Sequence, residues 1–315
     1  MKKNRLTKNL FKFLKKSVPL WLAVLIALDA AGAGIVVTGL VMRRKIDTIQ
    51  KQLVEINDPQ AIVKQATADV LPAGGYRTSL KWGEIGKKLV EAGAIDKAKY
   101  QESFKSEADG GIELDILDGD TGKFIEINEN NSRFVVNTLW ALGLANKSKV
   151  LDEGPMRTGG TDPGNFASTG GWTLGSKPAM DIYSSQELIP LTPVGQETVR
   201  KIAENVFRPC CGNSTAFPDC NHGMAALAYI ELAVSQGLPE KQIYKDLLGL
   251  NSFWFPSTYV EMAVYFKKDK NTEWKNVDPK TALSNDYSSA QGAAKINKAI
   301  ENVPGIKSRG GSCGA

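Results

Sequence analysis

An unbroken apolar segment near the N-terminus is the feature that most constrains how this chain can fold. Residues 19–42 read PLWLAVLIALDAAGAGIVVTGLVM and contain a single charged side chain, Asp29. An α-helix needs roughly 20 mostly apolar residues to cross the hydrocarbon core of a bilayer. We therefore predict a transmembrane helix at 19–42, with the membrane lipid bilayer as its partner.

Asp29 lies near the middle of this span, where a charge costs about 2.5–3.5 kcal/mol on insertion scales. Its carboxyl is expected to be protonated, paired with a neighbouring helix, or in contact with a membrane partner subunit. A cleaved signal peptide is the competing interpretation, because Ala-Gly-Ala at 31–33 resembles a cleavage site. The apolar run continues to Met42 and ends at Arg-Arg-Lys, which favours an uncleaved signal-anchor.

The basic residues around the span predict its orientation. Seven Lys or Arg precede it and three follow it, so the positive-inside rule places the N-terminus in the cytoplasm. Residues 1–18 become a basic cytoplasmic tail, and the rest of this single-pass chain lies outside the cytoplasmic membrane. From residue 46 onward the sequence contains 29 basic and 33 acidic side chains, so this part of the chain is mildly acidic. With no basic stripe interleaved with aromatics, we expect no nucleic-acid interface.

Beyond the membrane the sequence divides into three parts. Isoleucine and leucine recur at helical spacing between 46 and 56, which predicts a helical stalk over 43–70 that ends at the break LPAGG. Residues 71–304 form the predicted globular α-rich domain. The last eleven residues, 305–315, are rich in glycine and contain Cys313. They are expected to form a flexible tail.

The domain is predicted to be mostly α with a small β-hairpin, an α+β fold. Apolar spacing indicates two helices in 78–104, with Trp82 and Leu89 on one face and Gly93 as a stop, and later helices at 133–148, 193–207, 223–237, 239–250 and 288–303. Alternating apolar and acidic residues predict the hairpin, with strands 112–117 and 124–128 around DGDTGK. That turn lacks the later acids of a calcium-binding loop. The glycine-rich segment 154–177 is expected to be an ordered loop.

The segment FRPCCGNSTAFPDCNHGM, 207–224, gathers three of the four cysteines and the only histidine. Cys210, Cys211, Cys220 and His222 offer thiolate and imidazole ligands, which favour zinc or copper over magnesium or calcium. The spacing matches no standard zinc, haem or thioredoxin-type motif. Cys313, about nine residues beyond Pro304, is expected to reach the cluster as a fourth ligand or an exchanging thiol.

Two other interpretations of the cysteines remain open. The thiols can undergo thiol-disulfide exchange, or they can form structural disulfides outside the cytoplasm. Adjacent Cys210 and Cys211 can bridge each other only through a strained ring. A Cys220 nucleophile with His222 as base is a further hypothesis, and no GxSxG elbow is present. The sequence thus predicts a membrane-anchored extracytoplasmic metal-binding or metal-handover protein. The alternatives are a membrane-tethered thiol-disulfide oxidoreductase and an interaction protein with structural disulfides.

Overall fold

A computed structural model of the chain describes residues 41–46, 58–110 and 113–306. The predicted basic tail, nearly all of the predicted span at 19–42, and residues 307–315, which include Cys313, lie outside these ranges. Within the described ranges, no helix combines the length and apolarity that a membrane crossing requires. The chain divides into two compact units, Met1–Asp58 and Pro59–Ala315, and the second contains the domain.

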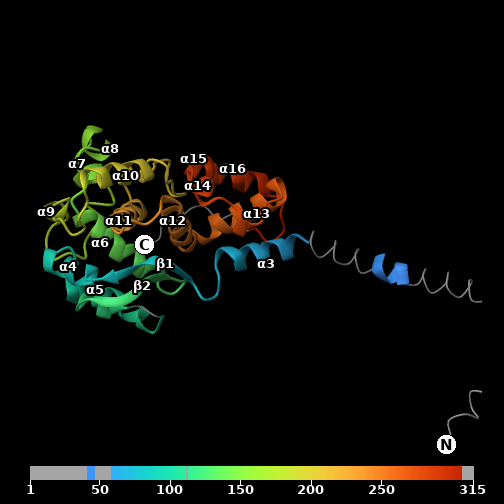
Figure 1. The fold of residues 1–315 in the computed structure, drawn as a ribbon, viewed down its shortest axis with the longest axis horizontal. Coiled ribbons are helices and arrows are strands. Elements are labelled where there is room, and N and C mark those ends of the chain that lie inside the picture. The colour runs from blue at the N-terminus through green and yellow to red at the C-terminus, as the bar shows by residue number, and fades with distance from the viewer. Residues whose placement is uncertain (1–40, 47–57, 111–112, 307–315) are drawn as a thin grey trace, which may run out of the picture. The chain divides into compact units, whose positions relative to one another are not determined.

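The second unit is mostly helical and contains a small two-stranded sheet, as the sequence predicts (Figure 1). Its first half comprises α3 (Pro59–Val70), β1 (Tyr76–Gly83), α4 (Ile85–Ala92), α5 (Lys97–Phe104), η1 (Lys105–Gly110), η2 (Leu114–Leu117), β2 (Thr121–Ile127), α6 (Ser132–Ala145), α7 (Lys149–Asp152), α8 (Pro155–Thr158), η3 (Pro163–Asn165) and α9 (Ala179–Ile182). Its second half comprises α10 (Pro193–Ala203), α11 (Asn221–Ser235), α12 (Glu240–Trp254), α13 (Pro256–Lys270), η4 (Trp274–Asn276), α14 (Pro279–Ala282), α15 (Asn285–Ser288) and α16 (Ala290–Ile300).

The two strands are not the predicted hairpin. β2 pairs antiparallel with β1, and the register joins Tyr76 to Ile127 and Gly83 to Thr121. The predicted first strand, 112–117, instead contains the 3-10 helix η2. Ile116 and Leu117 are both buried. In a strand, neighbouring side chains point to opposite faces, so a sheet with one buried face would bury only one of the two.

The start of the predicted helical segment 78–104 is also wrong. Thr78, Leu80 and Trp82 are buried and alternate with more exposed neighbours, the period-2 pattern of a strand that covers a core on one face. Helix α4 begins only at Ile85 and ends at the predicted stop, Gly93, whose φ of 78° lies in the left-handed region. Glycine adopts that conformation without a Cβ clash, so it ends the helix here.

Helices α6 and α11 form the centre of the domain. Both are buried on nearly every side, which fits their apolar composition. The two helices pack against each other at Gly143, where an added Cβ would lie 2.3 Å from the carbonyl oxygen of Met224. A side chain larger than hydrogen at 143 would therefore push the first turn of α11 away from α6.

Helix α3 packs against α13 and η4 at one end of the unit, where α14, α15 and α16 also gather (Figure 1). Its residues Ala66 and Val70 are buried in the core. The structure thus places 59–70, the second half of the predicted stalk, within the domain rather than before it. The break at 71–75 connects α3 to β1 instead of separating two parts of the chain.

Candidate metal centre

The cysteine loop between α10 and α11 is tied to the domain at several points. Phe207 and Ser214 form an isolated antiparallel bridge, and the backbone N–H of Thr215 donates to Val206 O at 2.7 Å. Across the loop, the N–H of Ala290 at the start of α16 donates to Cys211 O at 2.9 Å. These bonds fold the loop back on itself, so that Cys210 lies near the beginning of α11.

Cys220 is the N-cap of α11. Its backbone is extended, and its sulfur accepts a hydrogen bond from the N–H of Gly223 at 3.4 Å. Hydrogen bonds with Cys210 and Cys211, together with the positive charge of Arg208, hold the pKa of the Cys220 thiol well below its ordinary value. The positive end of the helix dipole favours the thiolate at the same position.

Arg208 organises this loop, and the sequence interpretation did not identify it. Its side chain is 1% exposed, and Nε donates to Cys220 Sγ at 3.0 Å. The remaining donors bind the carbonyl oxygens of Asn213, Ser214 and Phe217 and the carboxylate of Asp219. A buried arginine retains its charge and needs such partners. Its only signal in the sequence is its position two residues before the first cysteine.

Gly223 leaves the space that the guanidinium of Arg208 fills. A Cβ at Gly223 would lie 2.5 Å from Arg208 Cζ, a distance that side-chain packing does not allow. The guanidinium therefore lies directly against the first turn of α11. The glycine after His222 is required by this contact.

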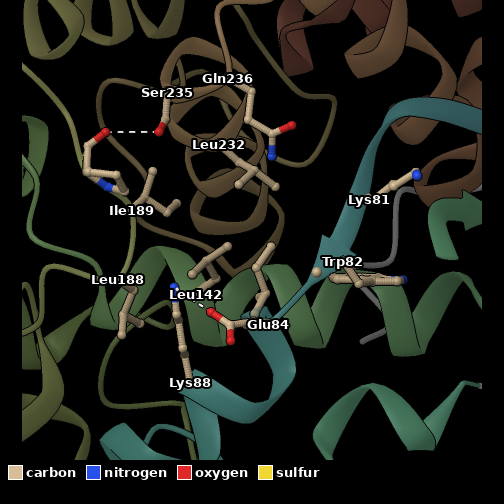
Figure 2. A pocket seen from close by; sticks show the side chains of 13 residues that line it. Lys81, Trp82, Glu84, Lys88, Leu142, Leu188, Ile189, Leu232, Ser235 and Gln236 are labelled. Carbon is tan, nitrogen blue, oxygen red and sulfur yellow. Dashed lines mark hydrogen bonds and ion pairs between the residues drawn. The ribbon is translucent and has the colours of Figure 1, made fainter. Parts of the chain in front are cut away.

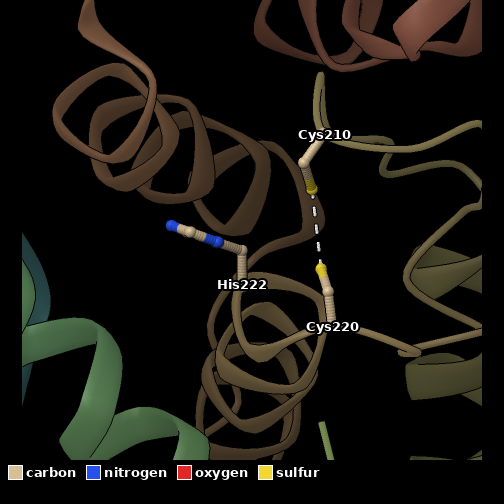
Figure 3. A group of neighbouring side chains, drawn as sticks. All are labelled: Cys210, Cys220 and His222. Atoms are coloured by element: carbon tan, nitrogen blue, oxygen red, sulfur yellow. Dashed lines mark hydrogen bonds between the residues drawn. The ribbon is translucent and has the colours of Figure 1, made fainter. Parts of the chain in front are cut away.

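Cys210, Cys220 and His222 are neighbours at this end of α11. Figure 3 shows the sulfurs of Cys210 and Cys220 directed toward each other and the ring of His222 directed away from them. The sulfurs of Cys210 and Cys220 are 3.5 Å apart, and one atom from each of the three residues lies within 4.8 Å of the others. Two sulfurs bound to one tetrahedral zinc at about 2.3 Å are separated by about 3.8 Å. The two thiols thus already lie close to the spacing of an occupied thiolate site.

His222 is buried, with 3% of its surface exposed. Its ring packs against Phe255 at a centroid distance of 4.5 Å and against Trp254 at 5.8 Å. Within the described part of the chain, Nδ1 has no hydrogen-bond partner. A buried polar atom without a partner is costly in a folded protein. A metal ion bound to this nitrogen would remove that cost, so the donor set fits a thiophilic metal.

The other two predicted ligands are placed differently. Cys211 faces Asn213 O and Asp219 Oδ1, each 3.9 Å from its sulfur. It is next to the three-residue group but is not part of it. Cys313 lies outside the described residues. Cys210, Cys211 and Cys220 are free thiols.

The glycine-rich segment 154–177 is ordered, as expected, and part of it packs on the cysteine loop. The ring of Phe166 contacts that of Phe217 at 5.3 Å, and the N–H of Ser168 donates to Asp219 O at 3.1 Å. Trp172 donates from its indole to Ala94 O at 2.8 Å. The segment thus contacts the loop through Phe166 and Ser168.

A cleft of about 240 Å³ lies near the other end of α11 (Figure 2). Leu142, Leu188 and Leu232 line it, and Glu84 and Lys88, which pair at 3.4 Å, also border it. Its lining contains neither cysteine nor histidine. The ligand-bearing side chains are therefore at the N-terminal end of α11 and separate from this cleft.

No protein-family model matches this chain, and neither a curated protein nor a solved structure gives a significant match. The function is therefore argued from the geometry of the site.

Proposed function

We propose that this protein binds a thiophilic transition-metal ion, zinc or copper, through Cys210, Cys220 and His222. The observation that carries the proposal is the unpartnered Nδ1 of buried His222, in a group whose ligand atoms lie within 4.8 Å of one another. Thiolate and imidazole are the ligands that zinc and copper prefer.

The surroundings of the three ligands support binding of a cation. A metal requires deprotonated cysteines, and both Arg208 and the N-terminus of α11 stabilise the thiolate of Cys220. Three protein ligands leave one position of a tetrahedral site open, an arrangement typical of sites that exchange or activate a further ligand. Cys211, beside the group, is the nearest candidate to complete it.

The wider role that we propose is metal handover at the surface of a membrane. It depends on the anchor predicted at 19–42, on the domain facing outward, and on Cys313 as an exchanging ligand. These residues lie outside the described ranges. The proposal therefore rests on the sequence for its membrane part and on the three-residue group for its metal part.

The test is the metal content of the purified full-length chain, kept reduced in detergent and incubated with zinc or copper(I). We expect about one ion per chain, loss of binding in Cys220→Ser and in His222→Gln, and retained binding in the control Arg200→Lys, an exposed change on α10. The variant Cys211→Ser tests whether Cys211 is the fourth ligand. If it is, this variant should bind the metal more weakly than the unmodified chain. If the double variant Cys210→Ser/Cys220→Ser binds as much metal as the unmodified chain, these cysteines are not the ligands and the proposed site is wrong.

A further inference from the structure

The two cysteine ligands are also positioned to bond to each other. Cys210 and Cys220 are ten residues apart in sequence, yet their sulfurs are 3.5 Å apart in a direct contact (Figure 3). A disulfide needs about 2.05 Å between the sulfurs. The loop ends thus need to approach by only about 1.5 Å, whereas the neighbouring pair Cys210 and Cys211 would close a strained ring.

We propose that Cys210 and Cys220 react with small disulfides, and that the resulting Cys210–Cys220 disulfide releases the metal. The inference rests on the proposed function for the release step. The substrate class is a low-molecular-weight disulfide, written here as RSSR. The same two sulfurs serve both states, so metal binding and disulfide formation exclude each other.

The exchange occurs in two substitutions. The Cys220 thiolate attacks one sulfur of RSSR, the S–S bond of RSSR breaks, and one RS⁻ leaves. The Cys210 thiolate then attacks Cys220 Sγ, which forms the internal disulfide and expels the second RS⁻. Two electrons pass from the protein sulfurs to the substrate sulfurs, and the released thiolates take protons from water. Of the three ligands in the group only His222 then remains, which is too few to retain the ion.

The surroundings assign the attacking role to Cys220. Its sulfur accepts hydrogen bonds from Arg208 Nε at 3.0 Å and from the N–H of Gly223 at 3.4 Å. Among the described residues, Cys210 has neither of these hydrogen bonds. Its sulfur lies against that of Cys220, so Cys210 is positioned to act as the resolving thiol, which attacks the mixed disulfide on Cys220. Both cysteines are half-buried, and the exchange requires that a small disulfide reach them in the folded domain.

The experiment uses the full-length reduced chain in detergent, loaded with zinc and freed of excess metal. Oxidised glutathione is added as the probe, zinc release is followed with a chromogenic chelator, and thiols are counted in the same samples. We expect one zinc released for each two thiols lost, a Cys210–Cys220 disulfide in the peptide map, and recovery of binding after reduction.

Three variants separate the steps. In Cys210→Ser we expect one glutathione to accumulate on Cys220, because the resolving thiol is missing. Cys211→Ser should still form the Cys210–Cys220 disulfide. Arg208→Lys should slow the first step several-fold, while Arg200→Lys, the same change on the exposed face of α10, should leave the rate unchanged.

Other results overturn the inference. A disulfide that joins Cys211 or Cys313 in place of Cys210 contradicts the assigned pair. Zinc that stays bound while the two thiols disappear contradicts the release step, as do thiols that stay reduced in excess oxidised glutathione. If the metal proposal is wrong, the reduced chain will contain no zinc before any oxidant is added, and this result is distinct from a failure of the release step. Disulfide formation in that metal-free chain is then measured separately.

Discussion

Buried charged side chains in this domain differ in how many partners they have. Arg208 is nearly inaccessible but donates to three carbonyl oxygens, a thiolate and a carboxylate. Glu231 on α11 is fully buried, and its Oε2 accepts from Asn146 Nδ2 at 2.9 Å. Its Oε1 has no hydrogen-bond partner among the described residues. Burial accordingly raises the pKa of Glu231 to about 8.

This shift predicts how stability depends on pH. Between pH 4.5 and about 8, the folded chain keeps the proton on Glu231 that the unfolded chain has lost. Stability therefore falls as pH rises through this interval, by at most about 1.4 kcal/mol per pH unit from this one group, and changes no further from it above that interval. Below the interval both states are protonated, and Glu231 contributes no pH dependence.

The Glu231→Gln variant removes the titrating group and keeps an oxygen to accept from Asn146. We expect the free energy of unfolding to fall less steeply from pH 5 to 8, and the variant to be more stable than the unmodified chain at pH 9. Urea unfolding at each pH measures this difference. Glu91→Gln, an exposed change on α4, is the control. Parallel pH profiles for Glu231→Gln and the unmodified chain would show that Glu231 is not protonated at neutral pH.

At the scale of elements, one carboxylate joins β1, α11 and α12. Asp246 on α12 is fully buried. Its Oδ1 accepts from the hydroxyl of Tyr76 at 2.7 Å and from Gln242 Nε2 at 2.8 Å, and its Oδ2 accepts from the hydroxyl of Tyr229 at 2.6 Å and from the N–H of Ser79 at 3.0 Å. The strand is thus fixed to both helices through a single side chain.

Replacing Asp246 with alanine leaves the hydroxyls of buried Tyr229 and half-buried Tyr76, and a strand N–H, without their acceptor. We expect a loss of about 3 kcal/mol or more in the free energy of unfolding, since bonds to charged acceptors and unsatisfied buried donors are each costly. Denaturant unfolding with far-ultraviolet circular dichroism measures it. Asp278→Ala, which removes an exposed N-cap of α14, should cost about 1 kcal/mol. A smaller loss for Asp246→Ala than for this control would refute the prediction.

At the scale of the whole molecule, membrane orientation is the prediction that connects the domain to its surroundings. Seven basic residues before the apolar segment and three after it predict an N-terminus in the cytoplasm. Protease added to intact spheroplasts should therefore digest the domain after residue 46 and leave the first residues protected. A permeabilised sample in which both parts are cleaved is the control. A protected domain with a clipped N-terminus would reverse the orientation.

Local sequence patterns were enough to predict the helical character of the domain and the segment that contains the candidate metal ligands. Apolar residues at helical spacing predict α6 and α11. Helix α10 begins at Pro193, the first residue of the helix predicted at 193–207, and the Thr192 side chain accepts from the N–H of Gly195. Three cysteines and the single histidine in one short segment identified the loop. These signals are local, because helical hydrogen bonds and caps join residues only a few positions apart.

Only the tertiary structure decided which distant residues meet. The pairing of β1 with β2 joins residues more than thirty positions apart, and the DGDTGK turn offered a closer but incorrect partner for β2. Likewise, spacing could not show that Cys210 and Cys220 contact each other while Cys211 faces Asp219, or that buried Arg208 donates to Cys220. Strand pairing and side-chain direction in a loop depend on long-range packing and on where buried polar groups find partners. A linear pattern does not contain that information.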